Sequence, residues 1–128
     1  MMPIRQVIKA ANIPEHSNPF PTAVKIKNML FSSAVGGDDP DTHALPPDKQ
    51  AQITNVFQNI RNIMAAAGGT PANIGKVTIY VADRDDRRLI NPHWLEMFPD
   101  ADDRPVRHTA ATSLPPGRHI QIEFIAVL

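Results

Sequence analysis

Two charged residues near the end of the chain lie on segments whose remaining residues favour β-strands. Arg107 follows Pro105 and Val106, and Glu123 lies inside the run 120–127. A guanidinium donates two parallel hydrogen bonds to a carboxylate and stays charged at neutral pH, whereas a carboxylate can hold a water molecule or move a proton. The pair is therefore either the working part of a site for a small carboxylated molecule or a structural ion pair within the fold.

Strand alternation predicts which residues accompany each charge. Thr109 shares a face with Arg107, where it could hold a water molecule or the leaving amine, while His108 points to the opposite face. Glu123 lies on a face of mixed polarity at the border of an apolar surface. The opposite face of that strand is apolar and consists of Ile120, Ile122, Phe124 and Ala126.

One long amphipathic helix is predicted over residues 48–67 because its apolar residues recur at helical spacing. These residues are Ile53, Val56, Phe57, Ile60, Ile63 and Met64. Asp48, preceded by two prolines, is a suitable start, and Gly68 and Gly69 supply a left-handed stop. The stripe is expected to form the core of the protein.

The other elements complete the order β-β-β-α-β-α-β-β. Strands are predicted over 4–8, 23–27, 29–33, 74–82 and the two terminal segments on either side of the proline–glycine turn, with residues 36–47 as a loop. A second helical region begins near residue 83, and its main helix is expected to run from Pro92 to Phe98 with Asn91 as N-cap. This order predicts an α+β fold with one mixed β-sheet and two helices packed on one face.

The apolar content of the strands exceeds what one layer of helices can cover. Val24, Ile26, Val77 and Ile79 contribute to this surplus, together with the final strand. We therefore expect the open sheet face to be buried by association with other copies of the chain.

Composition excludes several classes of function. The 128 residues are expected to form a single domain over 1–128, and their 13 basic and 13 acidic residues leave no basic patch for nucleic acid. With no cysteine and no metal-ligand spacing among the five histidines, neither a metal nor a cofactor is expected. No signal peptide or membrane-spanning segment is recognisable, so a cytoplasmic location without membrane contact is expected.

An ordered set of segments resembles the Rid (YjgF-like) family of reactive intermediate deaminases. The segments are Asn18–Val24, Leu30–Ser33, Ala66–Gly69, Ile74–Val81, Asn91–Phe98, Arg104–Thr109 and Ile120–Val127. The resemblance runs nearly end to end. Its most specific part is Pro-x-Arg at 105–107, followed by Ile-Glu-x-Ile-Ala-Val at 122–127.

The resemblance implies a chorismate-mutase-like fold, assembled as a homotrimer with sites in the clefts between subunits. It also implies hydrolysis of small carboxylated imines or enamines to 2-oxo acids and ammonia, without a cofactor. In that family the arginine matched by Arg107 binds the substrate carboxylate, and the glutamate matched by Glu123 places or activates water. Asn91 matches an asparagine near the site, and Ser33 and Ala34 belong to a segment whose backbone lines it.

Three residues depart from the family pattern. Phe20 replaces the usual tyrosine, Ala34 replaces a glycine, and Thr109 stands where cysteine is common. Because Arg107 and Glu123 are retained while these three residues of the site lining differ, the sequence indicates the same chemistry on a different substrate. Short 2-imino acids and longer enamines such as 2-aminomuconate both remain open.

Other interpretations are kept alongside the deaminase hypothesis. A trimeric metabolite-binding protein without turnover would need Arg107 but not Glu123, and an RNA-cleaving role is disfavoured by the neutral charge. Asn91 has the alternative role of a helix cap, and Phe20 and Trp94 that of packing or interface residues.

Overall fold

The computed structural model describes residues 3–128. Its strands are β1 (Arg5–Val7), β2 (Ala23–Ile26), β3 (Met29–Ser32), β4 (Val35–Gly36), β5 (Ile74–Val81), β6 (Val106–Ala111) and β7 (Ile120–Val127). Its helices are α1 (Lys49–Ala66), α2 (Arg87–Met97) and the short 3-10 helices η1 (Pro71–Asn73) and η2 (Arg84–Asp86). The predicted order is confirmed, with the two-residue strand β4 added at the start of the predicted loop.

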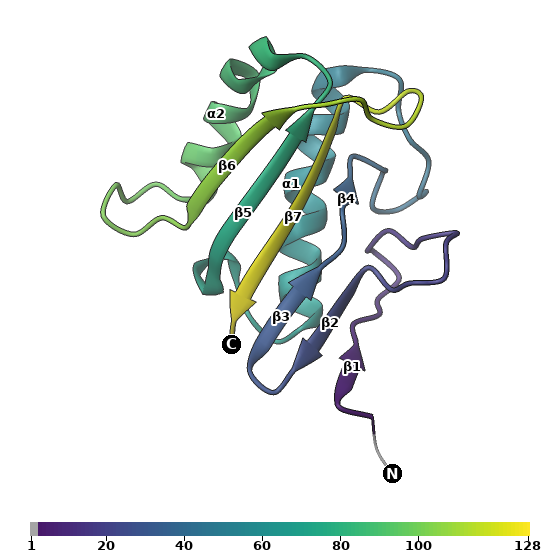
Figure 1. Cartoon of the computed structure of the whole chain (residues 1–128), viewed down its shortest axis with the longest axis vertical. Helices are drawn as coiled ribbons and strands as arrows, with labels where there is room; N and C mark the ends of the chain where they lie inside the picture. The colour runs from purple at the N-terminus through teal and green to yellow at the C-terminus, as the bar shows by residue number, and fades with distance from the viewer. Residues whose placement is uncertain (1–2) are drawn as a thin grey trace.

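All strands join one sheet in the order β1-β2-β3-β7-β5-β6, and β4 pairs with β7 (Figure 1). The β5–β6 pair is parallel and the other pairs are antiparallel, so the sheet is mixed as predicted. Consecutive strands β6 and β7 are not neighbours, because β5 lies between them. This arrangement places Arg107 on the edge strand and Glu123 near the middle of the sheet.

Both helices cover the same face of the sheet (Figure 1). The side chains of β5 and β7 that point to this face are buried, including Val77, Ile79 and Ile122. The prediction that Val77 and Ile79 add to an uncovered surface is therefore wrong, since both lie beneath the helices. Val24 and Ile26 do lie on the open face, where they pair with Phe31 and Met29 of β3.

Helix α1 has the predicted ends and the predicted buried stripe. The Asp48 carboxylate accepts a hydrogen bond from the Ala51 N–H at 2.9 Å, and Gly68 adopts a φ of +86° just beyond the helix. The six apolar residues of the stripe are all buried. Within residues 3–128, no helix is both long enough and apolar enough to cross a membrane.

Helix α2 starts earlier than predicted and contains Pro92 in its interior. It follows directly from η2, which is capped by the Asp83 carboxylate on the Asp85 N–H at 2.9 Å. A proline inside a helix removes one hydrogen bond, and here a preceding turn and the buried contacts of Ile90 and Trp94 outweigh that loss. Asn91 is therefore in mid-helix, and the prediction that it caps the helix is wrong.

Candidate functional site

The seven predicted site residues lie in three places within one chain. Arg107, Thr109 and Asn91 meet at the β6 edge on the helix-covered side. Phe20, Ser33 and Ala34 lie around the segment that precedes β2 and the end of β3. Glu123 lies on the open face of the sheet. The structure thus assembles partial sites rather than one complete site in a single chain.

The Arg107 guanidinium is held in a fixed orientation by three neighbours. Its Nε donates to Thr109 Oγ1 at 2.9 Å, and its Nη1 donates to Asn91 Oδ1 at 2.9 Å. Its carbon Cζ lies 5.1 Å from the centre of the Trp94 ring, which is a cation–π distance. The fork is therefore positioned before any ligand arrives.

Among the described residues 3–128, no carboxylate neutralises Arg107. Within residues 3–128 the ion pairs are Lys49–Asp86 and Arg118–Asp38. A guanidinium has five N–H donors, and since Arg107 uses two of them on neutral oxygens, three remain for a ligand. Burial and then the positive charge of Arg87 lower the pKa of Arg107, so its surroundings favour the approach of an anion.

Strand pairing separates Arg107 from Glu123. Arg107 aligns with Val77 on β5 and so points toward the helices, whereas Glu123 aligns with Thr78 and points to the open face. The hypothesis that Arg107 and Glu123 form an ion pair within one chain is therefore wrong.

Glu123 has a partner that sequence reasoning did not identify. The Tyr80 hydroxyl donates a hydrogen bond to Glu123 Oε1 at 3.1 Å. This hydrogen bond raises the pKa of Tyr80, and the negative charge of Glu123 raises it further because it opposes ionisation of the phenol. The carboxylate borders a hollow of about 230 Å³ that Lys76, Thr78 and Ser32 also line. Alternation alone places Tyr80 on the face of Thr78, but only the β5–β7 pairing brings it to Glu123.

His16 connects two residues of the second group, Ser33 and Phe20. Its Nε2 is hydrogen-bonded to Ser33 Oγ at 2.7 Å, and its ring centre lies 4.3 Å from that of Phe20. Burial lowers the pKa of His16, the positive charge of Arg118 lowers it further, and Asp38 partly opposes both. No local pattern marks His16 as a site residue, because its partner Ser33 is distant along the chain.

Ala34 lines a cleft of about 370 Å³ together with the Arg118–Asp38 ion pair. The two Arg118–Asp38 hydrogen bonds are 2.8 and 3.1 Å long. Gly36 makes room for this pair, since a Cβ there would lie 2.2 Å from Arg118 Nη1. Unlike Arg107, Arg118 is therefore committed to a structural partner.

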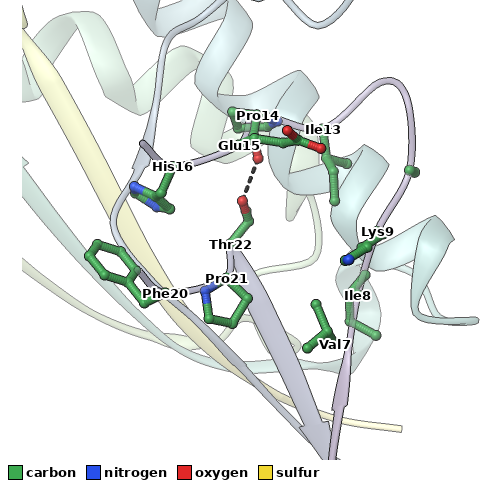
Figure 2. Close-up of a pocket in the computed structure, with 11 residues that line it drawn as sticks. Val7, Ile8, Lys9, Ile13, Pro14, Glu15, His16, Phe20, Pro21 and Thr22 are labelled. Atoms are coloured by element: carbon green, nitrogen blue, oxygen red, sulfur yellow. Dashed lines mark hydrogen bonds between the residues drawn. The ribbon is translucent and has the colours of Figure 1, made fainter. Parts of the chain in front are cut away.

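A pocket of about 190 Å³ adjoins this cleft and shares His16 and Phe20 with it (Figure 2). Figure 2 shows these two rings together on one side and Val7 on the other, with the Thr22 hydroxyl donating to the Pro14 carbonyl. This hydrogen bond holds the segment that carries His16 against the start of β2. Within residues 3–128, no group of three or more His, Asp or Glu side chains forms a metal site.

Comparisons with known proteins identify the family of this chain. The family model described as endoribonuclease L-PSP matches residues 10–128. A RutC family protein of Aquifex aeolicus is 32% identical over 94% of this chain and 97% of its own length. A 2-iminobutanoate/2-iminopropanoate deaminase of Bos taurus is 30% identical over 97% and 90%. The crystal structure of RidA from a Psychrobacter species superposes with a TM-score of 0.88 at 29% identity, covering 96% of this chain and 99% of that one. The chain therefore belongs to the Rid (YjgF-like) family, with its chorismate-mutase-like α+β fold.

Proposed function

We propose that the protein hydrolyses 2-imino acids and their enamine tautomers to 2-oxo acids and ammonia. The observation that carries the proposal is the oriented Arg107 guanidinium, which has three free N–H donors and no carboxylate partner within residues 3–128. Such a fork suits the carboxylate that adjoins the C=N carbon of a 2-imino acid. Relatives named as deaminases support this activity.

In the proposed reaction one water molecule enters and one ammonia leaves. Arg107 binds the substrate carboxylate, and Glu123 accepts a proton from the water whose oxygen attacks the C=N carbon. The imine nitrogen takes up a proton, which Glu123 returns, and an amino alcohol results. The C–N bond then breaks, the C=O bond forms, and ammonia departs with the last hydroxyl proton.

The opposite orientations of Arg107 and Glu123 support a site shared between subunits. Within one chain they point to different faces of the sheet, so we infer that a second copy supplies one of them. The open face also exposes Val7, Met29 and Val127 by 44%, 37% and 48%, which favours burial against another copy. We therefore place the site in the clefts of a homotrimer.

The activity is tested by generating 2-imino acids with an amino-acid oxidase and following their disappearance with semicarbazide. Hydrogen bonds to a charged group contribute about 1.5–3 kcal/mol, so Arg107→Ala is expected to lower kcat/KM by about 10- to 150-fold. Glu123→Gln should lower kcat, whereas the exposed control Arg88→Ala should match the unmodified protein. No acceleration by the unmodified protein on any imine or enamine would refute the proposal.

Subunit mixing tests the shared site separately. Arg107→Ala and Glu123→Gln chains are unfolded together and refolded at equal concentrations. If each site takes Arg107 from one subunit and Glu123 from its neighbour, about one quarter of the sites in randomly mixed trimers regain both residues. No recovery of activity in mixed trimers would place both residues in the same chain and contradict the arrangement. Ligand binding that needs Arg107, without turnover, would instead favour a metabolite-binding role.

A further inference from the structure

A further cavity lies next to Thr109, the hydrogen-bond partner of Arg107, on the helix-covered side of the sheet edge. It has a volume of about 230 Å³ and is lined by Val81, Arg84, Arg87, Thr109 and Ala111. Thr109 belongs to both places, since it lines the cavity and accepts the hydrogen bond from Arg107 Nε. The proposed carboxylate anchor and this cavity are therefore contiguous.

The acidic residues of the same segment do not neutralise the arginines of the cavity. Residues 83–88 contain three aspartates and three arginines. The Asp83 carboxylate caps the η2 backbone at 2.9 Å, and the Asp86 carboxylate pairs with Lys49 of α1 at 3.0 Å. Within residues 3–128, Arg84 and Arg87 have neither an ion pair nor a side-chain hydrogen bond, and Asp85 is exposed without a cationic partner.

The cavity thus has an uncompensated positive charge. Arg87 is close enough to Arg107 for its charge to lower the pKa of Arg107, after the larger effect of burial. Arg87 also lies in the first turn of α2, where the helix dipole is positive and disfavours cations. An anion in the cavity would relieve each of these unfavourable interactions.

We propose that Arg84 and Arg87 bind a second anionic group of the substrate, so that the substrate is a 2-imino or enamine dicarboxylic acid. This inference rests on the proposed function, in which Arg107 binds the first carboxylate. The cavity has the volume of about eight water molecules, which is enough for a carboxylate and several carbons. Arginine suits the role because its planar fork matches a carboxylate.

Pairs of substrates that differ only in charge give the direct test. The imines of glutamate and glutamine have nearly the same shape, and aspartate with asparagine provides a shorter pair. The unmodified protein is expected to prefer the dicarboxylic imine by about tenfold or more in kcat/KM. Arg87→Gln and Arg84→Gln should reduce that ratio toward one, whereas Arg88→Gln, which changes an arginine outside the cavity, should leave it unchanged. An equal rate on both members of each pair, or a ratio that no cavity variant changes, would overturn the proposal.

Equilibrium binding separates this inference from the proposed activity. Calorimetry with 2-oxoglutarate and 2-oxobutanoate should show tighter binding of the dianion, and Arg87→Gln should abolish the difference. If that result appears without any imine turnover, the second anion site stands and the deaminase proposal falls. If Arg87→Gln instead weakens both ligands alike and light scattering shows dissociated subunits, the arginines bind a neighbouring copy and the inference is wrong.

Discussion

Thr109 offers the sharpest test of how Arg107 is positioned. Its hydroxyl oxygen accepts the Arg107 Nε–H at 2.9 Å, and Thr109→Val removes this acceptor while keeping the shape of the side chain. A hydrogen bond to a charged group contributes about 1.5–3 kcal/mol when water cannot replace it. Both residues are only partly buried, so water replaces some of that energy. We expect a loss of about 1 kcal/mol, which corresponds to an approximately fivefold fall in kcat/KM.

The assay must separate positioning from a loss of structure. The imine-trapping assay gives kcat and KM for Thr109→Val. We expect most of the change in KM, because the binding of the carboxylate stabilises the bound substrate and the transition state equally. Thr109→Ser keeps the hydroxyl and should restore most of the lost activity. The melting temperature should change little, since Thr109 lies on the edge strand β6.

Three results would refute the reasoning about Thr109. The first is an unchanged KM in Thr109→Val, which would mean that Nε needs no fixed acceptor. The second is a failure of Thr109→Ser to restore activity, which would assign the effect to packing. The third is a fall in melting temperature that parallels the fall in activity, which would indicate a structural role alone.

Three further predictions concern stability and its dependence on pH. Gln52→Leu should lower the free energy of unfolding by about 1.5–4.5 kcal/mol, because the buried amide makes three hydrogen bonds, to Pro46, Gly117 and His119. Urea titration measures this change, and an unchanged midpoint of urea unfolding would contradict the prediction. Gly37→Ala should destabilise the folded protein by about 1–3 kcal/mol, since the added Cβ would lie 2.4 Å from the Gln52 carbonyl oxygen. An unchanged free energy of unfolding in Gly37→Ala would contradict this close approach. The lowered pKa of His16 means that the unfolded chain binds its proton more readily, so stability is full above pH 6.5 and falls as the pH drops below it. His16→Gln should flatten that part of the profile of unfolding free energy against pH, and an unaltered profile would contradict the assignment.

Local sequence patterns were sufficient to predict the helices, the longer strands and which residues of each strand point to the same face of the sheet. The helical spacing that ends at Met64 and the cap at Asp48 are local signals, and both are confirmed by α1. The alternation that separates Arg107 from His108 is likewise a property of one strand, and the pairing with β5 agrees with it. The error at Pro92 came from giving the proline more weight than the buried contacts of the helix around it, and the two-residue strand β4 was too short to leave a pattern.

Contacts between distant segments were beyond sequence reasoning. Nothing in the two terminal strands indicates that β5 lies between them, although this fact separates Arg107 from Glu123. The Tyr80–Glu123 hydrogen bond depends on the same pairing. Whether two polar residues meet across a sheet depends on strand order, and strand order depends on the burial of all strands together.

The segment 83–88 shows why charge counted along the sequence does not describe a site. Its three aspartates and three arginines balance, and their pattern favours a solvated start of a helix. In the fold, Asp83 accepts a hydrogen bond from the backbone of η2, and Asp86 forms an ion pair with Lys49 of α1. Arg84 and Arg87 are therefore left without a carboxylate partner, and both line the cavity next to Thr109. The neutral charge of the whole chain argues against nucleic acid as a partner, but it does not argue against a small dianion. What decides that question is the direction in which each side chain turns, and this direction is set by partners that the local sequence does not contain.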